Sequence, residues 1–211
     1  MIFKDIIFEK ISIEQMYKTQ MNRFNDKSLI DFNPIALSSA LISDKRKEGA
    51  ENEFIDSYLE GAKVIMHEIY RKQRQMADGI NKIFYNYSLE IPTIYLCRHC
   101  IELSIKHAIG RQGKDSKQTH GLEGQWNAFR QYLPQDRISG KERSLLNNMG
   151  EFIRSMDSLD DNGTRLRYPV QEDKSYSQEN FMWTNTRAIV ENTESFVKQL
   201  ELLELTDKNC K

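Results

Sequence analysis

Apolar residues recur at three- and four-residue steps along most of the chain, which is the period of an amphipathic α-helix. The clearest stretch covers about residues 50–84, and its repeating positions are Ile55, Tyr58, Leu59, Ala62, Ile65, Met66, Ile69, Met76, Ile80 and Ile83. Pro92 suits the first turn of a second helix, which we expect over 93–110. This second segment is apolar on most sides, so we expect neighbouring helices to enclose it.

Three more helices are predicted after residue 110. A short one stops at Pro134, and its apolar face consists of Leu122, Trp126, Phe129 and Leu133. The next ends at the turn sequence 160–163, and its apolar positions are Leu145, Leu146, Met149, Phe152, Ile153, Met156 and Leu159. A loop over 164–177 leads to a last helix at about 178–205. Four long amphipathic helices with moderate loops predict an all-α fold, an up-and-down antiparallel helical bundle.

The N-terminal part of the chain carries a weaker pattern. Residues 5–13 fit either a strand or the start of a helix, and a capping-box sequence at 12–15 opens a helical pattern that reaches Phe24. One more short helix is expected over 35–42. A polar break at 45–49 then divides the chain into three parts: a small N-terminal extension at 1–48, the bundle at 49–205 and a C-terminal tail at 206–211.

The composition restricts the cellular location and the kinds of partner that we expect for this protein. The chain has 30 Lys and Arg against 31 Asp and Glu, a formal charge of −1, which disfavours extended non-specific binding to nucleic acid. Asp5 and Glu9 interrupt the apolar start where a signal peptide needs an unbroken run, and no apolar run approaches the ~20 residues that span a bilayer. An odd count of three cysteines does not make a disulfide framework. We therefore expect a cytoplasmic protein without membrane contact.

One polar stripe stands out on the otherwise apolar helix at 93–110. Residues four apart on a helix lie nearly in line, so Arg98, Glu102 and Lys106 share one line and His99 lies beside them. A solvated row of ion pairs is one interpretation. The other is a small anion or ribonucleotide site, in which Arg98 and Lys106 are the cations, Glu102 orients them, and His99 acts as acid or base.

Other sequence patterns give weaker indications of a functional site. Cys97 and Cys100 have the spacing of a zinc or redox pair, but they lie inside one predicted helix, where no turn brings four ligands around a metal. We interpret them as two buried small residues and expect no metal site. No P-loop, Rossmann, zincin or Gly-x-Ser-x-Gly motif occurs, so no cofactor is expected.

Three elements in fixed order resemble the HEPN superfamily, the small helical bundles of prokaryotic toxin–antitoxin and phage-defence systems. They are the central-helix sequence from Arg98 to Lys106, the sequence Thr119-His-Gly-Leu122, and the sequence Leu166-Arg-Tyr-Pro169. The resemblance covers roughly residues 50–205. It implies an up-and-down bundle, a homodimer, and either metal-independent ribonuclease activity or nucleotide binding, with an antitoxin or effector protein as a further partner.

The chain departs from this family's pattern: Gly121 stands where the family has an Asp after its loop His, Val170 follows the Arg-Tyr-Pro, and the nuclease pair is missing. The nucleases carry an Arg and a His separated by four to six residues, and no histidine here has an arginine at that distance before it. The resemblance therefore leaves three hypotheses open: a diverged metal-independent endoribonuclease, a non-catalytic module that binds nucleotide or RNA, or an interaction scaffold. For the first we expect four catalytic residues and three that bind RNA: Arg98, His99, Glu102 and His120, then Lys106, Arg167 and Tyr168. These residues form one cluster if the loop that carries Arg167 folds back on the central helix.

Overall fold

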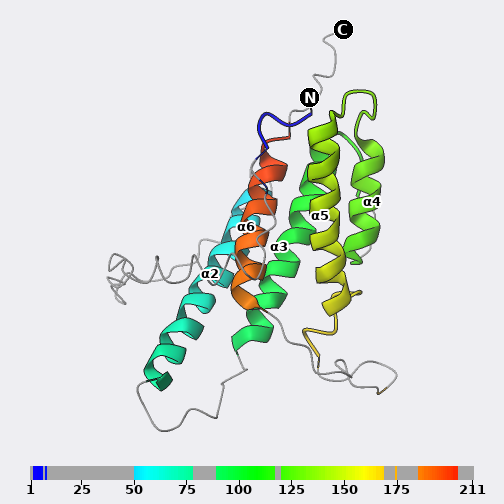
Figure 1. Ribbon diagram of the computed structural model, residues 1–211. Coiled ribbons are helices and arrows are strands. Elements are labelled where there is room, and N and C mark those ends of the chain that lie inside the picture. Colours follow the sequence, from blue (N-terminus) through cyan, green and yellow to red (C-terminus); the bar gives the residue numbers. More distant parts are fainter. Residues whose placement is uncertain are drawn as a thin grey trace.

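The computed structural model describes residues 2–6, 8, 50–77, 89–116, 120–168, 174 and 185–203. Within them the chain forms five α-helices and no strand longer than an isolated bridge, so the predicted all-α fold is confirmed (Figure 1). The helices are α2 (Ala50–Ala77), α3 (Glu90–Arg111), α4 (Leu122–Tyr132), α5 (Gly140–Leu159) and α6 (Thr186–Glu201).

Helix α3 is the central element of the bundle. It packs against α2, α4 and α6, and its buried residues point to several sides of the helix. Pro92 lies in its first turn, where the missing backbone N–H removes no helical hydrogen bond. The expectation that neighbours enclose this apolar helix is confirmed. The buried apolar residues of α3 are Ile94, Cys97, Cys100, Ile101, Ile105, Ala108 and Ile109.

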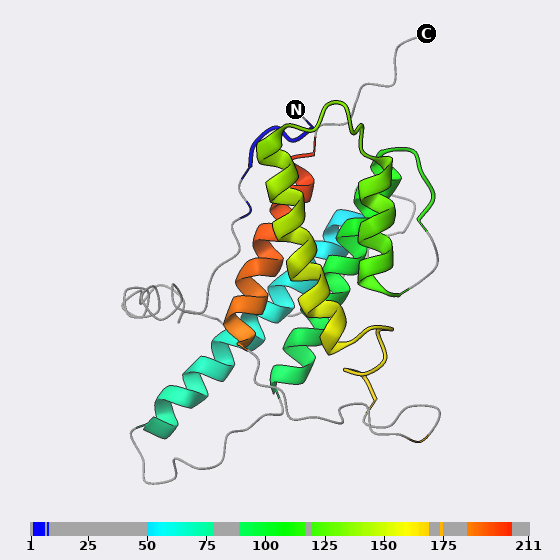
Figure 2. The same cartoon turned by 45° about the vertical axis from the view of Figure 1, so that its right-hand side comes forward.

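The bundle does not alternate direction at every connection. Helices α3 and α4 run in the same direction (Figure 2). Lys114, just after the end of α3, accordingly lies 5.9 Å from the ring centroid of Tyr132 at the end of α4. The ten residues between α3 and α4 can span up to about 33 Å. The eleven-residue helix α4 is only about 16 Å long, so this connection is long enough for two parallel helices. The start of α4 lies beside the first half of α3, where the side chain of Arg98 donates to the carbonyl oxygen of His120.

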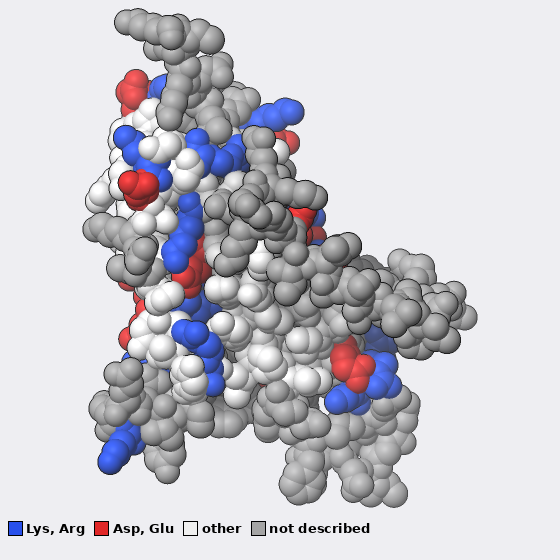
Figure 3. Space-filling view, turned by 180° about the vertical axis from the view of Figure 1, so that it is seen from behind, with Lys and Arg blue, Asp and Glu red and all other residues white. Residues whose placement is uncertain are grey.

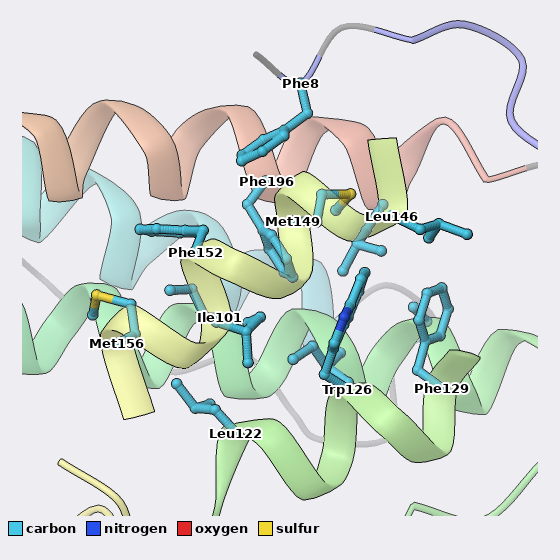
Figure 4. Packing of buried hydrophobic residues seen from close by; sticks show 14 of the residues in the cluster. Phe8, Ile101, Leu122, Trp126, Phe129, Leu146, Met149, Phe152, Met156 and Phe196 are labelled. Atoms are coloured by element: carbon cyan, nitrogen blue, oxygen red, sulfur yellow. The ribbon is translucent and has the colours of Figure 1, made fainter. Parts of the chain in front are cut away.

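An aromatic cluster fills the core between α4, α5 and α6 (Figure 4). The Trp126 ring stacks on Phe129 at 5.2 Å between centroids and meets Phe196 at 5.5 Å. Phe196 also contacts Phe152, at 6.2 Å. Gly150 on α5 permits this packing, since a Cβ there would lie 3.0 Å from Nε1 of Trp126. Aromatic pairs at these distances add to the free energy gained by burying their apolar area.

The first residues of the chain lie against the bundle. Ile2 and Phe3 are buried, and Phe3 forms an isolated antiparallel bridge with Leu203. The buried carboxylate of Glu142 accepts hydrogen bonds from the backbone N–H groups of Ile2 and Phe3, at 2.6 and 3.0 Å. Burial by itself raises the pKa of Glu142, but hydrogen bonds from Ser139, Phe3 and Ile2 outweigh it and lower the pKa to about 2. The described part of the N-terminal extension is therefore fixed to the start of α5.

Helix ends follow local capping chemistry. Ser139 and Glu142 form a capping box at the start of α5, and Asn185 caps the start of α6 through a bond to the backbone of residue 188. Helix α6 ends at Glu201 rather than at 205. The side chain of Arg111 donates hydrogen bonds to backbone carbonyls at this end, those of Leu200, Glu201 and Leu203.

Several predicted elements lie outside the described residues. They are the N-terminal helical stretches, the end of the first long helix after residue 77, and the stretch 178–184 before α6. Among the described helices, none combines the length and the apolar character that crossing a membrane requires.

Candidate functional site

Arg98 on α3 holds together three separate parts of the chain. Its guanidinium donates from Nη1 to Oε2 of Glu102 at 3.1 Å, from Nε to the carbonyl oxygen of Asp160 at 2.8 Å, and from Nη2 to the carbonyl oxygen of His120. Arg98 is only 1% exposed. Burying a guanidinium is costly unless its N–H groups are paired, so these bonds fix the start of α4 and the end of α5 on α3.

The carboxylate of Glu102 is the centre of this polar cluster. One oxygen accepts from Arg98, and the other accepts from Nζ of Lys106 at 2.7 Å. Burial raises the pKa of this carboxyl, but the hydrogen bonds and charges of Lys106 and His120 exceed that effect, so the pKa of Glu102 lies below its ordinary value. Glu102 is therefore ionised at neutral pH although it is only 3% exposed.

His120 completes the cluster from the loop before α4. Its Nδ1 lies 3.0 Å from Oε1 of Glu102. Next to an ionised carboxylate, Nδ1 carries the proton and donates it, which leaves Nε2 as the nitrogen that faces outward. The side chain of His120 is 61% exposed. We name these four residues, Arg98, Glu102, Lys106 and His120, the Glu102 cluster.

A turn after α5 covers one side of the Glu102 cluster. The buried carboxylate of Asp160 accepts from the backbone N–H groups of Arg165 and Leu166, at 3.1 and 3.4 Å, which closes the turn. Gly163 lies at its tip with φ of +77°, in the left-handed region. A Cβ at Gly163 would lie 3.1 Å from Nη1 of Arg98. Only glycine suits both this backbone conformation and this close approach.

Arg167 and Tyr168 follow this turn. Nε of Arg167 donates to the carbonyl oxygen of Gly163, and the guanidinium lies over the ring of Tyr95 on α3, 5.7 Å from its centroid. The same guanidinium lies 5.9 Å from the centroid of the Tyr168 ring. The loop thus folds back onto α3 beside Arg98, as the sequence hypothesis required for a single cluster.

His99 occupies a different environment from His120. Its ring stands edge-on to Tyr58 at 4.6 Å and nearly parallel to Tyr95 at 6.0 Å between centroids. Burial lowers the pKa of His99, and the positive charges of Lys106, Arg167 and Arg98 add to that effect against the opposing charge of Glu102. His99 is therefore neutral at pH 7 and lies among tyrosine rings.

The two cysteines of α3 lie in the core. Cys97 and Cys100 are both fully buried, and burial raises the pKa of each thiol to about 12. A thiolate is the form that binds metal or attacks a disulfide, so both side chains stay protonated and inert at neutral pH. Among the residues that the structure describes, no group of three or more His, Cys, Asp or Glu side chains is arranged to hold a metal ion.

The structure brings the residues expected from sequence into two adjoining groups. Arg98, Glu102, Lys106 and His120 share hydrogen bonds, while His99 and Arg167 lie against Tyr95 and Tyr168 lies against Arg167. Sequence reasoning did not single out four contributors: Tyr58, Tyr95, Asp160 and Gly163. Tyr95 lies four residues before His99, so its position on the polar stripe was the available signal. Asp160 and Gly163 were interpreted only as residues that end a helix.

Comparison of the chain with protein-family models, with curated proteins and with solved structures gave no match.

Proposed function

We propose that this protein cleaves RNA without a metal ion, with His120 as the group that moves the proton. The observation that carries the proposal is the hydrogen bond of His120 Nδ1 to the buried, ionised carboxylate of Glu102. A carboxylate that fixes one ring nitrogen leaves the other oriented for acid–base chemistry.

The chemistry needs few protein groups, because RNA supplies its own nucleophile. Nε2 of His120 takes the proton of a ribose 2′-hydroxyl as its oxygen attacks the adjacent phosphorus. The bond from phosphorus to O5′ then breaks, and the leaving oxygen takes a proton from water. The products are a 2′,3′-cyclic phosphate and a 5′-hydroxyl. The ammonium of Lys106 bonds to the same oxygen of Glu102 as the imidazole does, and the Lys106 side chain is about a quarter exposed; in this mechanism it stabilises the negative charge on the phosphorane.

The burial of Arg98 and Glu102 changes the roles that we assign to these two expected catalytic residues. Arg98 and Glu102 are enclosed, so in this mechanism they position His120 and do not touch the RNA. Arg167 and Tyr168 are exposed and serve as RNA contacts. The biological setting, a toxin or phage-defence system with a homodimer and an antitoxin or effector partner, rests on the sequence resemblance to the HEPN superfamily alone.

Nucleotide or RNA binding without cleavage is the second candidate. It is favoured by the placement of His99 among tyrosines, because the Glu102 cluster then offers a single imidazole to a substrate. Two-histidine sites divide the base and acid roles between two rings, and this cluster does not.

The experiment is cleavage of total RNA and tRNA in EDTA by the purified protein and by His120→Ala. General acid–base groups typically contribute 10²- to 10⁴-fold, so we expect His120→Ala to lose about 100-fold or more of the rate. His67→Ala is the matched control, because His67 is an exposed histidine on α2, outside the cluster. Absence of cleavage by the folded wild type, or equal rates for wild type and His120→Ala, rejects the catalytic proposal.

A further inference from the structure

The rings near the start of α3 form a surface that continues the line of the Glu102 cluster. Tyr95 and His99 are four residues apart, and Glu102 follows three residues later, so all three lie along one side of the helix. Seven residues of helix span about 10 Å. A short stretch of one polynucleotide strand can therefore contact both groups at once.

The guanidinium of Arg167 lies near two tyrosine rings at this end of the line. It lies 5.7 Å from the centroid of Tyr95 and 5.9 Å from that of Tyr168, and its Nε bond to Gly163 fixes its orientation. Arg167 is exposed, and Tyr168 is 56% exposed. Tyrosine rings and guanidinium planes that remain open to solvent are the surfaces on which unpaired bases stack.

Two further rings adjoin this surface through Tyr95. His99 stacks nearly parallel to Tyr95 and stands edge-on to Tyr58 of α2, and burial keeps the His99 ring neutral. A neutral ring among tyrosines adds no positive charge next to Arg167. We call the group made by Tyr95, Arg167 and Tyr168, with the adjoining rings of His99 and Tyr58, the aromatic platform.

Gly163 joins the platform to the Glu102 cluster. Its carbonyl accepts from Arg167, while a Cβ on it would lie 3.1 Å from the guanidinium of Arg98 and 3.5 Å from Cβ of His120. The two groups are therefore direct neighbours.

The charge distribution argues for stacking as the source of affinity. On the face shown in Figure 3, basic and acidic side chains are interspersed and border a broad uncharged area, and over the whole sequence 30 Lys and Arg are balanced by 31 Asp and Glu. Polynucleotide binding through the phosphates alone needs several clustered cations. Contacts to base rings supply affinity without them.

We propose that the aromatic platform binds an unpaired nucleobase of single-stranded RNA, with Tyr168 and Arg167 as the stacking surface. This rests on the proposed function for its ligand class, since it assigns a recognition role next to the same cluster. The occupant is a base in a flexible strand, because a base paired within a duplex does not present its face to a protein surface.

The test measures binding separately from cleavage. Two 2′-O-methyl oligonucleotides, which lack the 2′-hydroxyl nucleophile, are compared by fluorescence anisotropy: one carries adenine bases and the other has the same backbone with abasic sites. We expect the wild type to prefer the adenine-bearing strand by roughly 5- to 100-fold, the range that one to a few stacked bases provide. Tyr168→Ala and Arg167→Gln should lose most of this preference, and Tyr168→Phe should keep it.

Tyr132→Ala is the matched control. Tyr132 is also an exposed tyrosine with a cation near its ring, Lys114 at 5.9 Å, but it lies at the opposite end of α4. Equal binding of the two strands by the wild type, no binding of either, or the same loss in Tyr132→Ala as in Tyr168→Ala overturns the platform. A base preference in a protein that does not cleave RNA rejects the cleavage proposal and leaves the platform standing. Cleavage without a base preference supports the cleavage proposal and rejects the platform.

Discussion

Replacing Arg98 by methionine tests whether this residue fixes the start of α4 and the end of α5 to α3. Methionine keeps much of the volume, so the change removes hydrogen bonds without a large cavity. The carbonyl oxygens of His120 and Asp160 and one oxygen of Glu102 each lose a donor. Breaking a buried, hydrogen-bonded charge pair by removing one partner costs about 3–5 kcal/mol. We expect a decrease of that size in the free energy of unfolding.

Urea unfolding at pH 7, followed by circular dichroism, measures this change. Arg71→Met is the matched control: Arg71 also donates two hydrogen bonds to one carboxylate, that of Glu68 at 2.6 and 2.7 Å, but its side chain is 57% exposed. Exposed ion pairs contribute little, so we expect no measurable shift of its urea midpoint. If Arg98→Met unfolds at the same urea concentration as the wild type or as Arg71→Met, the interpretation that Arg98 fixes these helix ends is wrong.

Further predictions concern an acid and three glycines. Glu142→Gln should destabilise the protein by about 1.5–3 kcal/mol at pH 7, because hydrogen bonds to a charged acceptor are lost. Since the pKa of Glu142 is lowered to about 2, its stabilisation is complete above its ordinary value near 4.5 and is lost as the pH falls toward 2, so urea midpoints of wild type and variant should converge in that range. Gly163→Ala should cost about 1–3 kcal/mol through its positive φ and its contact with the arginine of the Glu102 cluster. Gly150→Ala should also lower the melting temperature, because the new Cβ lies 3.0 Å from Trp126, whereas Gly110→Ala, with open space at its helical position, should raise it.

The sequence predicts the helical framework well because its information is local. Three- and four-residue apolar steps identify α2, α4 and α5, and the nearly all-apolar α3 is correctly expected to be enclosed. The four-residue spacing of Arg98, Glu102 and Lys106 likewise predicts contacts that the structure contains.

Contacts between segments that are distant in the sequence could not be predicted from local periodicity. Periodicity says nothing of helix direction, so it did not predict that α4 runs parallel to α3. The same holds for Asp160 and Gly163, whose residue types indicate a turn but not what that turn covers. The docking of Ile2 and Phe3 depends on one buried acceptor, Glu142, whose local role as a capping residue gives no hint of it.

Analysis of the RNA ends tests the central claim most directly. The purified protein is incubated with tRNA in EDTA, and the new termini are identified for the wild type and for His120→Ala. Attack by the 2′-hydroxyl with His120 as base predicts 2′,3′-cyclic phosphates and 5′-hydroxyls that form at least about 100-fold more slowly in the variant. New 5′-phosphates, cleavage that stops in EDTA, or identical rates for the two proteins would contradict the account.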